Sequence, residues 1–180
     1  MSRLARDRDT HLTPDEIATA ALRQFDAGRA PSIRSLAAAL KVAPTAIYYH
    51  FPSRAAIVDA ALDQVWAEAA DRIPDARSTD AAELLVAAGL ATRRAFVGHG
   101  MLAQHLAQTP RIGERMVERL PPLADAFGRL GLEGEDAAVA FHTYASYVIG
   151  STLLATPGDR EHDEALFVAG LRRVVACLRP

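Results

Sequence analysis

Apolar residues recur at helical spacing through the first third of the chain. The pattern begins with Thr13, Pro14 and Glu16, in which the threonine caps a helix, the proline takes its first position and the glutamate reaches back to the cap. Gly28 ends this first predicted helix, because glycine readily adopts the backbone conformation found just beyond a helix. The apolar positions between these signals share one face and are Ile17, Ala18, Ala21, Leu22 and Phe25.

Three more helices are predicted before the middle of the chain. Ser32 caps a short one, and its inward positions are apolar. The next begins at Pro44 and ends before Pro52, since proline fits the first turn of a helix but breaks its interior. Ser53 caps the fourth, which is long and runs to about Arg72. The inward positions of the second helix are Ile33, Leu36, Ala37 and Leu40.

From about residue 80 the periodic segments become longer, and breaks containing glycine or proline separate them. The polar stretch 71–80 reads as a loop. We find no pattern typical of a strand, and the alanine-rich composition favours helices. The predicted fold class is therefore all-α. The predicted later helices lie near 80–97, 101–107, 112–120, 121–130, 135–155 and 161–178.

The third helix is too short to be stable alone, so its neighbours must hold it. Ile47 and Phe51 fall on one side of it and can pack on the second helix, while Val42 fills the turn between the two. Two short helices joined by a tight turn and braced by helices on either side form a helix-turn-helix, whose second helix enters the major groove of DNA. The outward positions are Thr45, Ala46, Tyr49 and His50, with Tyr48 at the flank.

These outward side chains suit contact with DNA. Tyrosine, histidine and threonine can donate hydrogen bonds to phosphate oxygens, and Ala46 is small enough to approach a thymine methyl. Arg34 and Arg54 flank the third helix. Alternatively, the two tyrosines are half-buried aromatics and His50 a surface residue. The arginines at positions 3, 6 and 8 form either an arm along the DNA backbone or a solvated terminus.

Charge and cysteine content add modest constraints. Residues 1–60 carry eight Lys/Arg and six Asp/Glu, while the rest carry twelve and sixteen, so the first third is mildly basic. Cys177 is the single cysteine, which excludes an intramolecular disulfide and suits a reducing cytoplasm. No apolar run approaches the length of a membrane span, and the N-terminus does not resemble a secretion signal. We therefore expect a cytoplasmic protein without a membrane partner.

The segment SIRSLAAALKVAPTAIYYHFPSRAAIVDAAL, with IYYHFPSR at its centre, resembles the DNA-binding domain of the TetR family of transcriptional regulators. The resemblance covers residues 13–70 and extends weakly to the last helix through FVAGLRRVVACL. It implies a DNA-binding domain over 1–72 and a helical effector-binding and dimerisation domain over 73–180. It also implies a homodimer on double-stranded DNA. The implied DNA-facing residues are Arg34, Thr45, Ala46, Tyr48, Tyr49, His50 and Arg54, and Lys41 can reach a phosphate.

Three positions depart from the usual pattern of that family. Lys41 stands at the tight turn where glycine is usual, so this residue is expected to adopt a positive φ at a cost of about 1–2 kcal/mol. Ala46 replaces a common threonine, and Arg54 replaces a common lysine, which keeps the charge but alters phosphate geometry. These changes bear on which operator sequence is read.

The last two predicted helices are candidates for a dimer interface, because a reader of one half-site needs a partner. The helix over 135–155 is apolar on more than one face, which indicates burial on both sides. The alternative is a core formed entirely within one chain. The predicted interface residues are His142, Ile149, Leu153, Phe167, Leu171, Val174 and Leu178.

Aromatic and methionine residues of the C-terminal part are candidates for lining an effector pocket, as apolar walls with a few polar tips suit an apolar ligand. For each, the alternative is an ordinary core position. No metal or cofactor is expected, because the histidines lack ligand spacing. The candidates are Trp66, Phe96, His99, Met101, His105, Met116, Phe141, Tyr144 and Tyr147.

Two other classes of function compete with this interpretation. A helical hydrolase or metalloprotein lacks support, since no HExxH, GxSxG, P-loop or dinucleotide motif is present. A protein-interaction adaptor remains open and differs from a DNA binder in its salt dependence. The favoured prediction is a ligand-responsive regulator, most simply a repressor that binds a palindromic operator as a homodimer and is released by a small apolar effector.

Overall fold

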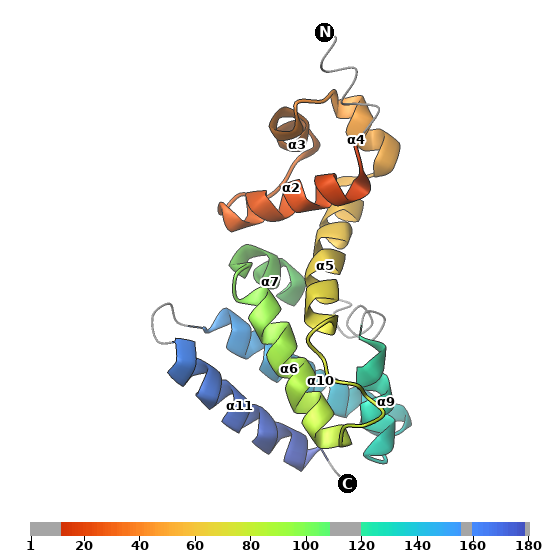
Figure 1. Cartoon of the computed structure of the whole chain (residues 1–180), viewed down its shortest axis with the longest axis vertical. Helices are drawn as coiled ribbons and strands as arrows, with labels where there is room; N and C mark the ends of the chain where they lie inside the picture. The colour runs from red at the N-terminus through yellow and green to blue at the C-terminus, as the bar shows by residue number, and fades with distance from the viewer. Residues whose placement is uncertain (1–11, 109–119, 156–159, 179–180) are drawn as a thin grey trace. The chain divides into compact units, whose positions relative to one another are not determined.

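The computed structural model describes residues 12–108, 120–155 and 160–178. These residues form helices joined by turns and loops, without a strand among them, so the all-α prediction is confirmed. The helices are α2 (Pro14–Asp26), α3 (Ile33–Leu40), α4 (Pro44–His50), α5 (Arg54–Ala70), α6 (Ala81–Phe96), α7 (Gly100–Ala107), α9 (Pro121–Arg129), α10 (Gly134–Leu153) and α11 (Arg160–Cys177) (Figure 1). Residues 112–119 of the predicted helix over 112–120, the arginines at 3, 6 and 8, and Met116 lie outside the described residues.

Side-chain caps mark the starts of α2, α3 and α5, as the sequence predicts. The Oγ1 of Thr13 accepts the backbone N–H of Glu16 at 3.2 Å, and the Glu16 carboxylate accepts the N–H of Thr13 at 2.9 Å. Ser32 forms the same reciprocal pair with Ser35 at the start of α3. Ser53 Oγ accepts the N–H of Ala56 at 3.2 Å and so caps α5. Each cap satisfies donors that a helix start would otherwise leave unpaired.

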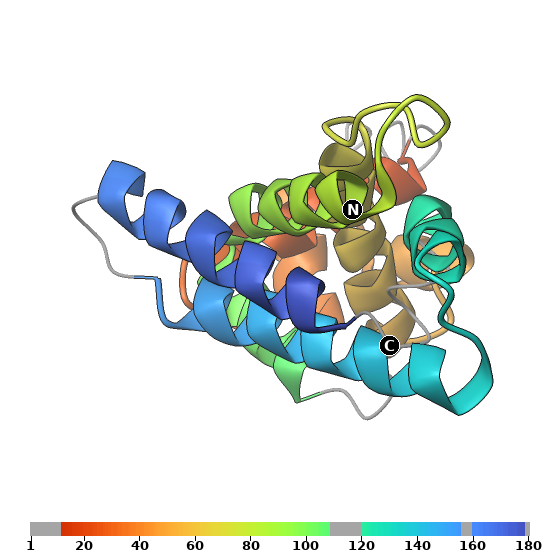
Figure 2. The same ribbon diagram turned by 90° about the horizontal axis from the view of Figure 1, so that it is seen from below.

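Contacts divide the chain into two compact units, residues 1–65 and 66–180, and the boundary falls within α5. The first unit packs α2, α3, α4 and the start of α5 around one apolar cluster. In the second unit α6 packs on α9, α10 and α11, and α7 packs mainly on α10. Figure 2 shows α10 and α11 running side by side, in agreement with their contacts.

Ion pairs reinforce the packing of α6 on α11. Arg172 donates two hydrogen bonds of 2.9 Å to the carboxylate of Glu83. Arg94 Nε donates to Glu164 at 2.9 Å, and this hydrogen bond lowers the pKa of the Glu164 carboxyl below its usual range. Both pairs are largely solvent-accessible, so each contributes little to the free energy of unfolding. Their main effect is to fix how α6 and α11 are aligned along each other.

Gly89 permits the close approach of three helices at the centre of the second unit. A β-carbon at this position of α6 would lie 2.5 Å from Leu171 Cδ2, 3.0 Å from the Tyr144 hydroxyl and 3.2 Å from Val148 Cγ2. The Tyr144 hydroxyl is itself fixed, since it donates to the Leu85 carbonyl at 2.8 Å. A side chain at position 89 would therefore force Leu171 and its neighbours to shift.

Gly89→Ala is expected to lower the free energy of unfolding by about 1–3 kcal/mol, because overpacking outweighs the gain in helix propensity. Gly128→Ala is the matched control. Gly128 also lies within a helix, and nothing lies within 4 Å of the added β-carbon, so this change should stabilise by about 0.5–1 kcal/mol. Urea denaturation of both variants measures the difference. Equal stabilisation by both substitutions would contradict the close packing of α6, α10 and α11 around Gly89.

Candidate nucleic-acid interface

Helix α4 is fastened to the first unit by its inward side chains, as predicted. Ile47 is fully buried and Phe51 nearly so, and both belong to the apolar cluster that includes Leu36 and Ile57. Val42 is half-buried against the same cluster. The seven residues of α4 are thus held by tertiary packing, which an isolated helix of this length requires.

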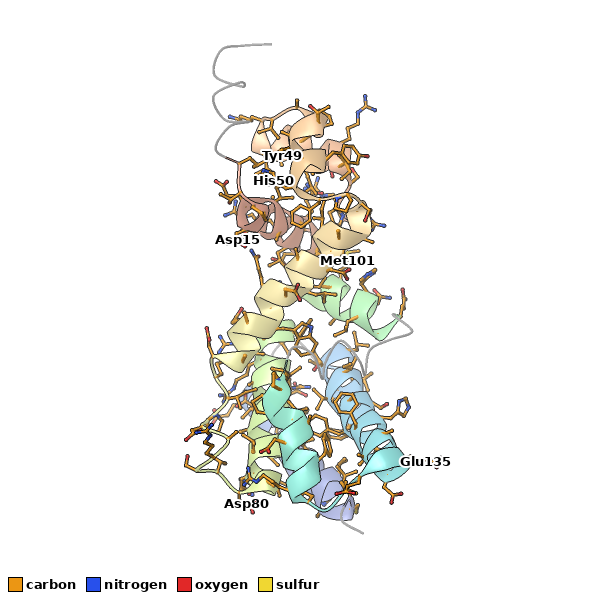
Figure 3. All side chains as sticks on the ribbon, turned by 90° about the vertical axis from the view of Figure 1, so that its right-hand side faces the viewer. Asp15, Tyr49, His50, Asp80, Met101 and Glu135 are labelled. Atoms are coloured by element: carbon orange, nitrogen blue, oxygen red, sulfur yellow. The ribbon has the colours of Figure 1, made fainter. Side chains whose placement is uncertain are left out.

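The other side of α4 carries side chains exposed to solvent. Tyr49 is 86% exposed and Tyr48 is 56% exposed, and Thr45 is also exposed. Ala46 and His50 are half-buried. The His50 ring meets the edge of the Tyr49 ring at a centroid distance of 5.2 Å, and Figure 3 labels both residues on α4. Aromatic groups of this size are seldom left uncovered without a partner, so this face of α4 is a candidate interface.

Lys41 adopts the left-handed conformation expected from its place in the turn, with φ 59° and ψ 40°. It is the one non-glycine residue with positive φ in the described part of the chain. Its N–H donates to the Ala38 carbonyl at 3.3 Å, and the N–H of Val42 donates to the Ala37 carbonyl at 3.0 Å, which closes the end of α3. The exposed lysine thus occupies a strained position beside α4, and strain of this kind gathers at functional sites.

Lys41→Gly is expected to raise the free energy of unfolding of the first unit by about 1 kcal/mol, because glycine adopts this conformation without a steric penalty. Ala39→Gly places the same residue at an exposed position inside α3 and should cost about 1 kcal/mol. Amide hydrogen exchange of the α3 and α4 backbone measures both effects. A loss of stability in both variants would show that the turn does not carry strain.

Two arginines accompany α4, and they differ in how they are held. Arg34 is exposed in the first turn of α3. Arg54 donates from Nε to the Pro31 carbonyl at 2.7 Å, which ties the start of α5 to the segment before α3. The Arg54 side chain therefore has a structural role that the sequence did not reveal. Arg34, Lys41 and Arg54 are exposed cations on the elements that precede and follow α4, and their contact with DNA stays a prediction.

Several predicted effector residues of the second unit take part in contacts between aromatic rings. Trp66 packs edge-on against Phe96 at a centroid distance of 4.8 Å. Phe127 meets both Phe141 and Tyr144, at 5.9 and 5.8 Å. Burial raises the pKa of Tyr144 far above its usual range, so its hydroxyl stays protonated as a donor within the core.

The remaining predicted effector residues within the described ranges are Tyr147, His99, Met101 and His105. Tyr147 stacks on Phe167 at a centroid distance of 5.6 Å, and its hydroxyl donates to the Phe167 carbonyl. His99, Met101 and His105 are half-buried at or within α7. Among the described residues, the ring contacts form separate pairs and groups, and the lining of one effector pocket by these residues stays a prediction.

The predicted dimer residues divide between surface and core. Ile149, Phe167 and Leu171 are buried within their own chain. His142 and Leu153 are exposed, and Val174 and Leu178 are half-buried. Helical periodicity identified the apolar positions but not which of them face inward.

Sequence reasoning missed several of the apolar side chains that α10 and α11 expose. Val139 is 60% exposed and Leu166 is 58% exposed, and Leu154 is exposed as well, whereas the exposed Leu153 was among the predicted residues. Cys177 is also exposed. A groove of about 540 Å³ between these helices is lined by Val139, Val174, Cys177 and other residues. The two helices therefore present an apolar surface to solvent.

Other kinds of site find little support in the described ranges. They contain no group of three or more His, Cys, Asp or Glu residues arranged to hold a metal ion. Across the same ranges, none of the helices combines the length and hydropathy needed to cross a bilayer. The arrangement that stands out chemically is the exposed face of α4 with its cations.

Comparison with known proteins places this arrangement in context. Residues 17–61 match the family described as "Bacterial regulatory proteins, tetR family", and residues 73–176 match "Tetracyclin repressor-like, C-terminal domain". An HTH-type transcriptional regulator of Saccharopolyspora erythraea is 30% identical over 156 residues. That match takes in 86% of this chain, and the chain spans 65% of the relative's length.

Solved structures share the fold over nearly the whole chain. A TetR variant from Acinetobacter baumannii in complex with minocycline is 25% identical, with a TM-score of 0.75 and coverage of 92% of this chain and 96% of that one. The TetR family protein ActR of Streptomyces coelicolor in complex with actinorhodin is 22% identical, with a TM-score of 0.74 and coverage of 93% and 95%. At 22% identity, the similarity to ActR shows a common fold.

Proposed function

The chain belongs to the TetR family of bacterial regulatory proteins, and from that premise we propose that it is a repressor that binds a palindromic operator as a homodimer and is released by a small apolar effector. In this proposal residues 1–72 read DNA, and residues 73–180 bind the effector and form the dimer. The protein acts in the cytoplasm as a regulator and not as an enzyme. The observation that carries the proposal is α4, which is anchored by buried Ile47 and presents exposed Tyr48 and Tyr49.

The proposed contacts follow from the position of each side chain around α4. Thr45 and Ala46, in the first turn, approach base edges, while Tyr48, Tyr49 and His50 reach toward the phosphates. Aromatic hydroxyls and imidazole N–H groups suit phosphate oxygens as acceptors. The proposed cationic contacts are Arg34, Lys41 and Arg54.

Salt dependence tests DNA binding against the adaptor alternative. Release of counterions makes the logarithm of the DNA association constant fall linearly with the logarithm of salt, by about 0.9 for each phosphate neutralised. Fluorescence anisotropy on a labelled duplex should show this slope, and Lys41→Gly should reduce it by about one while the fold becomes more stable. If the protein does not bind duplex DNA even at low salt, the proposed function is refuted.

We propose that α10 and α11 pair with their copies in a second chain to form a four-helix bundle. The exposed Val139, Leu153 and Leu166 supply apolar area on these helices. Val174 and Leu178 line a groove with Val139, and His142 is exposed on α10. Buried Ile149, Phe167 and Leu171 support that surface from within their own chain.

Sedimentation velocity should therefore give a species of twice the chain mass. Leu166→Glu places a charge on the proposed interface and should shift the equilibrium toward monomer, because an unpaired charge is costly to bury. The exposed position Ala124→Glu on α9 is the control and should leave the dimer unchanged. A wild-type monomer at micromolar concentration would contradict the dimeric proposal.

Release by an effector follows if the ligand prefers a dimer whose two α4 helices miss adjacent major grooves. A switch from 1% to 99% of that state requires about 5.5 kcal/mol of differential affinity. The solved relative bound to minocycline supports a small-molecule site in proteins of this kind.

A further inference from the structure

Two buried side-chain atoms in the described part of the chain have no hydrogen-bond partner, Trp66 Nε1 and Thr92 Oγ1. Trp66 is 1% exposed and Thr92 is 2% exposed. Buried polar atoms are paired in the large majority of cases, so each exception calls for a physical reason. Both residues adjoin Phe96, since the Trp66 ring packs on it and Thr92 lies one turn before it on α6. Both residues therefore lie beside Phe96 in the second unit.

A small cavity lies beside Thr92. Its volume is about 10 Å³, which is the space of about one water molecule. Its walls come from α6, α7 and α10 and consist of Thr92, Phe96, Ala103, Leu106, Ile149 and Thr152. Thr152 is satisfied, because its hydroxyl donates to the Val148 carbonyl at 2.7 Å. Thr92 is thus the lining residue whose hydrogen-bonding capacity is unused.

The chemistry of this neighbourhood selects a class of ligand. The indole Nε1 can only donate, and the threonine hydroxyl can donate as well, so both groups seek an acceptor. No charged side chain lines the small cavity, and an ionised ligand would lose its hydration without a counter-charge there. The nearby cation Arg93 is already engaged, since it donates to Asp163 and to the Ser151 carbonyl.

We propose that Trp66 and Thr92 are the polar anchors of the effector site and that the effector is a neutral, ring-containing molecule with an acceptor oxygen such as a ketone carbonyl. This inference rests on the proposed function, in which the second unit binds a small apolar effector. Ala103 and Leu106 form the wall contributed by the short helix α7. A ring-sized ligand makes room by displacing that helix, because the present cavity is much smaller than a ring.

Two probes with the same ring skeleton test the anchors, 1-indanone with a carbonyl oxygen and indane without one. The hydrocarbon is the more hydrophobic of the two, so a preference for the ketone must come from hydrogen bonds. Isothermal titration calorimetry on the full chain should show 1-indanone binding about tenfold more tightly than indane. Amide hydrogen exchange should rise in residues 100–107 when the ketone binds.

Three variants make the test specific. Thr92→Val and Trp66→Phe each remove one unpaired atom, and each should reduce the ketone preference at least fivefold while indane binding changes little. Thr143→Val is the control, because this exposed threonine of α10 donates to the Val139 carbonyl outside the cavity and should keep the full preference. In Thr92→Val without ligand, the melting temperature should equal or exceed that of the wild type.

Four results would overturn the inference. Two concern the wild type: neither probe binds at millimolar concentration, or indane binds at least as tightly as the ketone. Two concern Thr92→Val: the ketone preference is unchanged, or the melting temperature is several degrees lower. The last would mean that an internal water already satisfies the hydroxyl. These outcomes leave DNA binding untouched. Conversely, ketone binding that requires both anchors but does not release DNA would refute the effector role in the proposed function while sustaining the site.

Discussion

Replacing Arg34, Tyr49 and His50 together by alanine should lower affinity for operator DNA by about 100-fold, equivalent to about 2.7 kcal/mol. The three side chains lie on the exposed side of α3 and α4 or at its margin, and none belongs to the buried cluster of the first unit. The variant should therefore fold normally and still lose its contacts with phosphates and bases. Fluorescence anisotropy at several salt concentrations measures affinity and slope, and circular dichroism checks the fold.

Arg23→Ala is the matched control for that variant. Arg23 is an exposed cation in the last turn of α2, so its removal changes the net charge without touching α4. Because salt screens this distant charge, Arg23→Ala should change the affinity for operator DNA by less than about twofold. Arg54 is left intact in both proteins. Its replacement would also remove the hydrogen bond to the Pro31 carbonyl, so a loss of DNA contact could not be told from a loss of structure. An unchanged affinity in the triple variant would refute α4 as the reading helix.

Ile47→Ala should lower the free energy of unfolding of the first unit by about 2–4 kcal/mol, the usual cost of removing a fully buried aliphatic side chain. Helix α4 depends on this residue and Phe51, because seven residues are too few to be stable alone. We expect loss of DNA binding together with loss of hydrogen-exchange protection in α3 and α4.

Tyr48→Ala in the same helix serves as the stability control for Ile47→Ala. Its side chain is 56% exposed, so the free energy of unfolding should change by less than about 0.5 kcal/mol. Protection in hydrogen exchange would then remain while DNA affinity falls. Equal destabilisation by the two substitutions would mean that Ile47 is not the side chain that anchors α4.

The first unit was predictable because its signals are local. Threonine and serine caps, two prolines and a four-residue apolar spacing define α2 to α4 without reference to distant parts of the chain. The positive φ of Lys41 was expected from the resemblance to the TetR family, in which glycine is usual at this turn. The bond from Arg54 to Pro31 was not predictable, since it joins residues whose proximity depends on how three helices pack.

The second unit was less predictable, because periodicity gives the apolar positions of a helix without naming what covers them. Phe167 and Leu171 belong to an apolar stripe of α11, and the stripe packs inside its own chain. Leu166, one residue earlier, is exposed instead. The unpaired hydroxyl of Thr92 left no trace in the sequence, because only the absence of a partner in the fold distinguishes it from other threonines.

The central claim is that two copies of this chain read one palindromic site through α4. Selection of genomic DNA fragments bound by the purified full chain, followed by sequencing, tests it most directly. The account predicts an enriched inverted repeat whose half-sites are spaced so that two α4 helices can enter successive major grooves on one face of the duplex. It also predicts that the enrichment disappears in the Arg34, Tyr49 and His50 variant. A consensus without two-fold symmetry, or no enriched sequence at all, would contradict it.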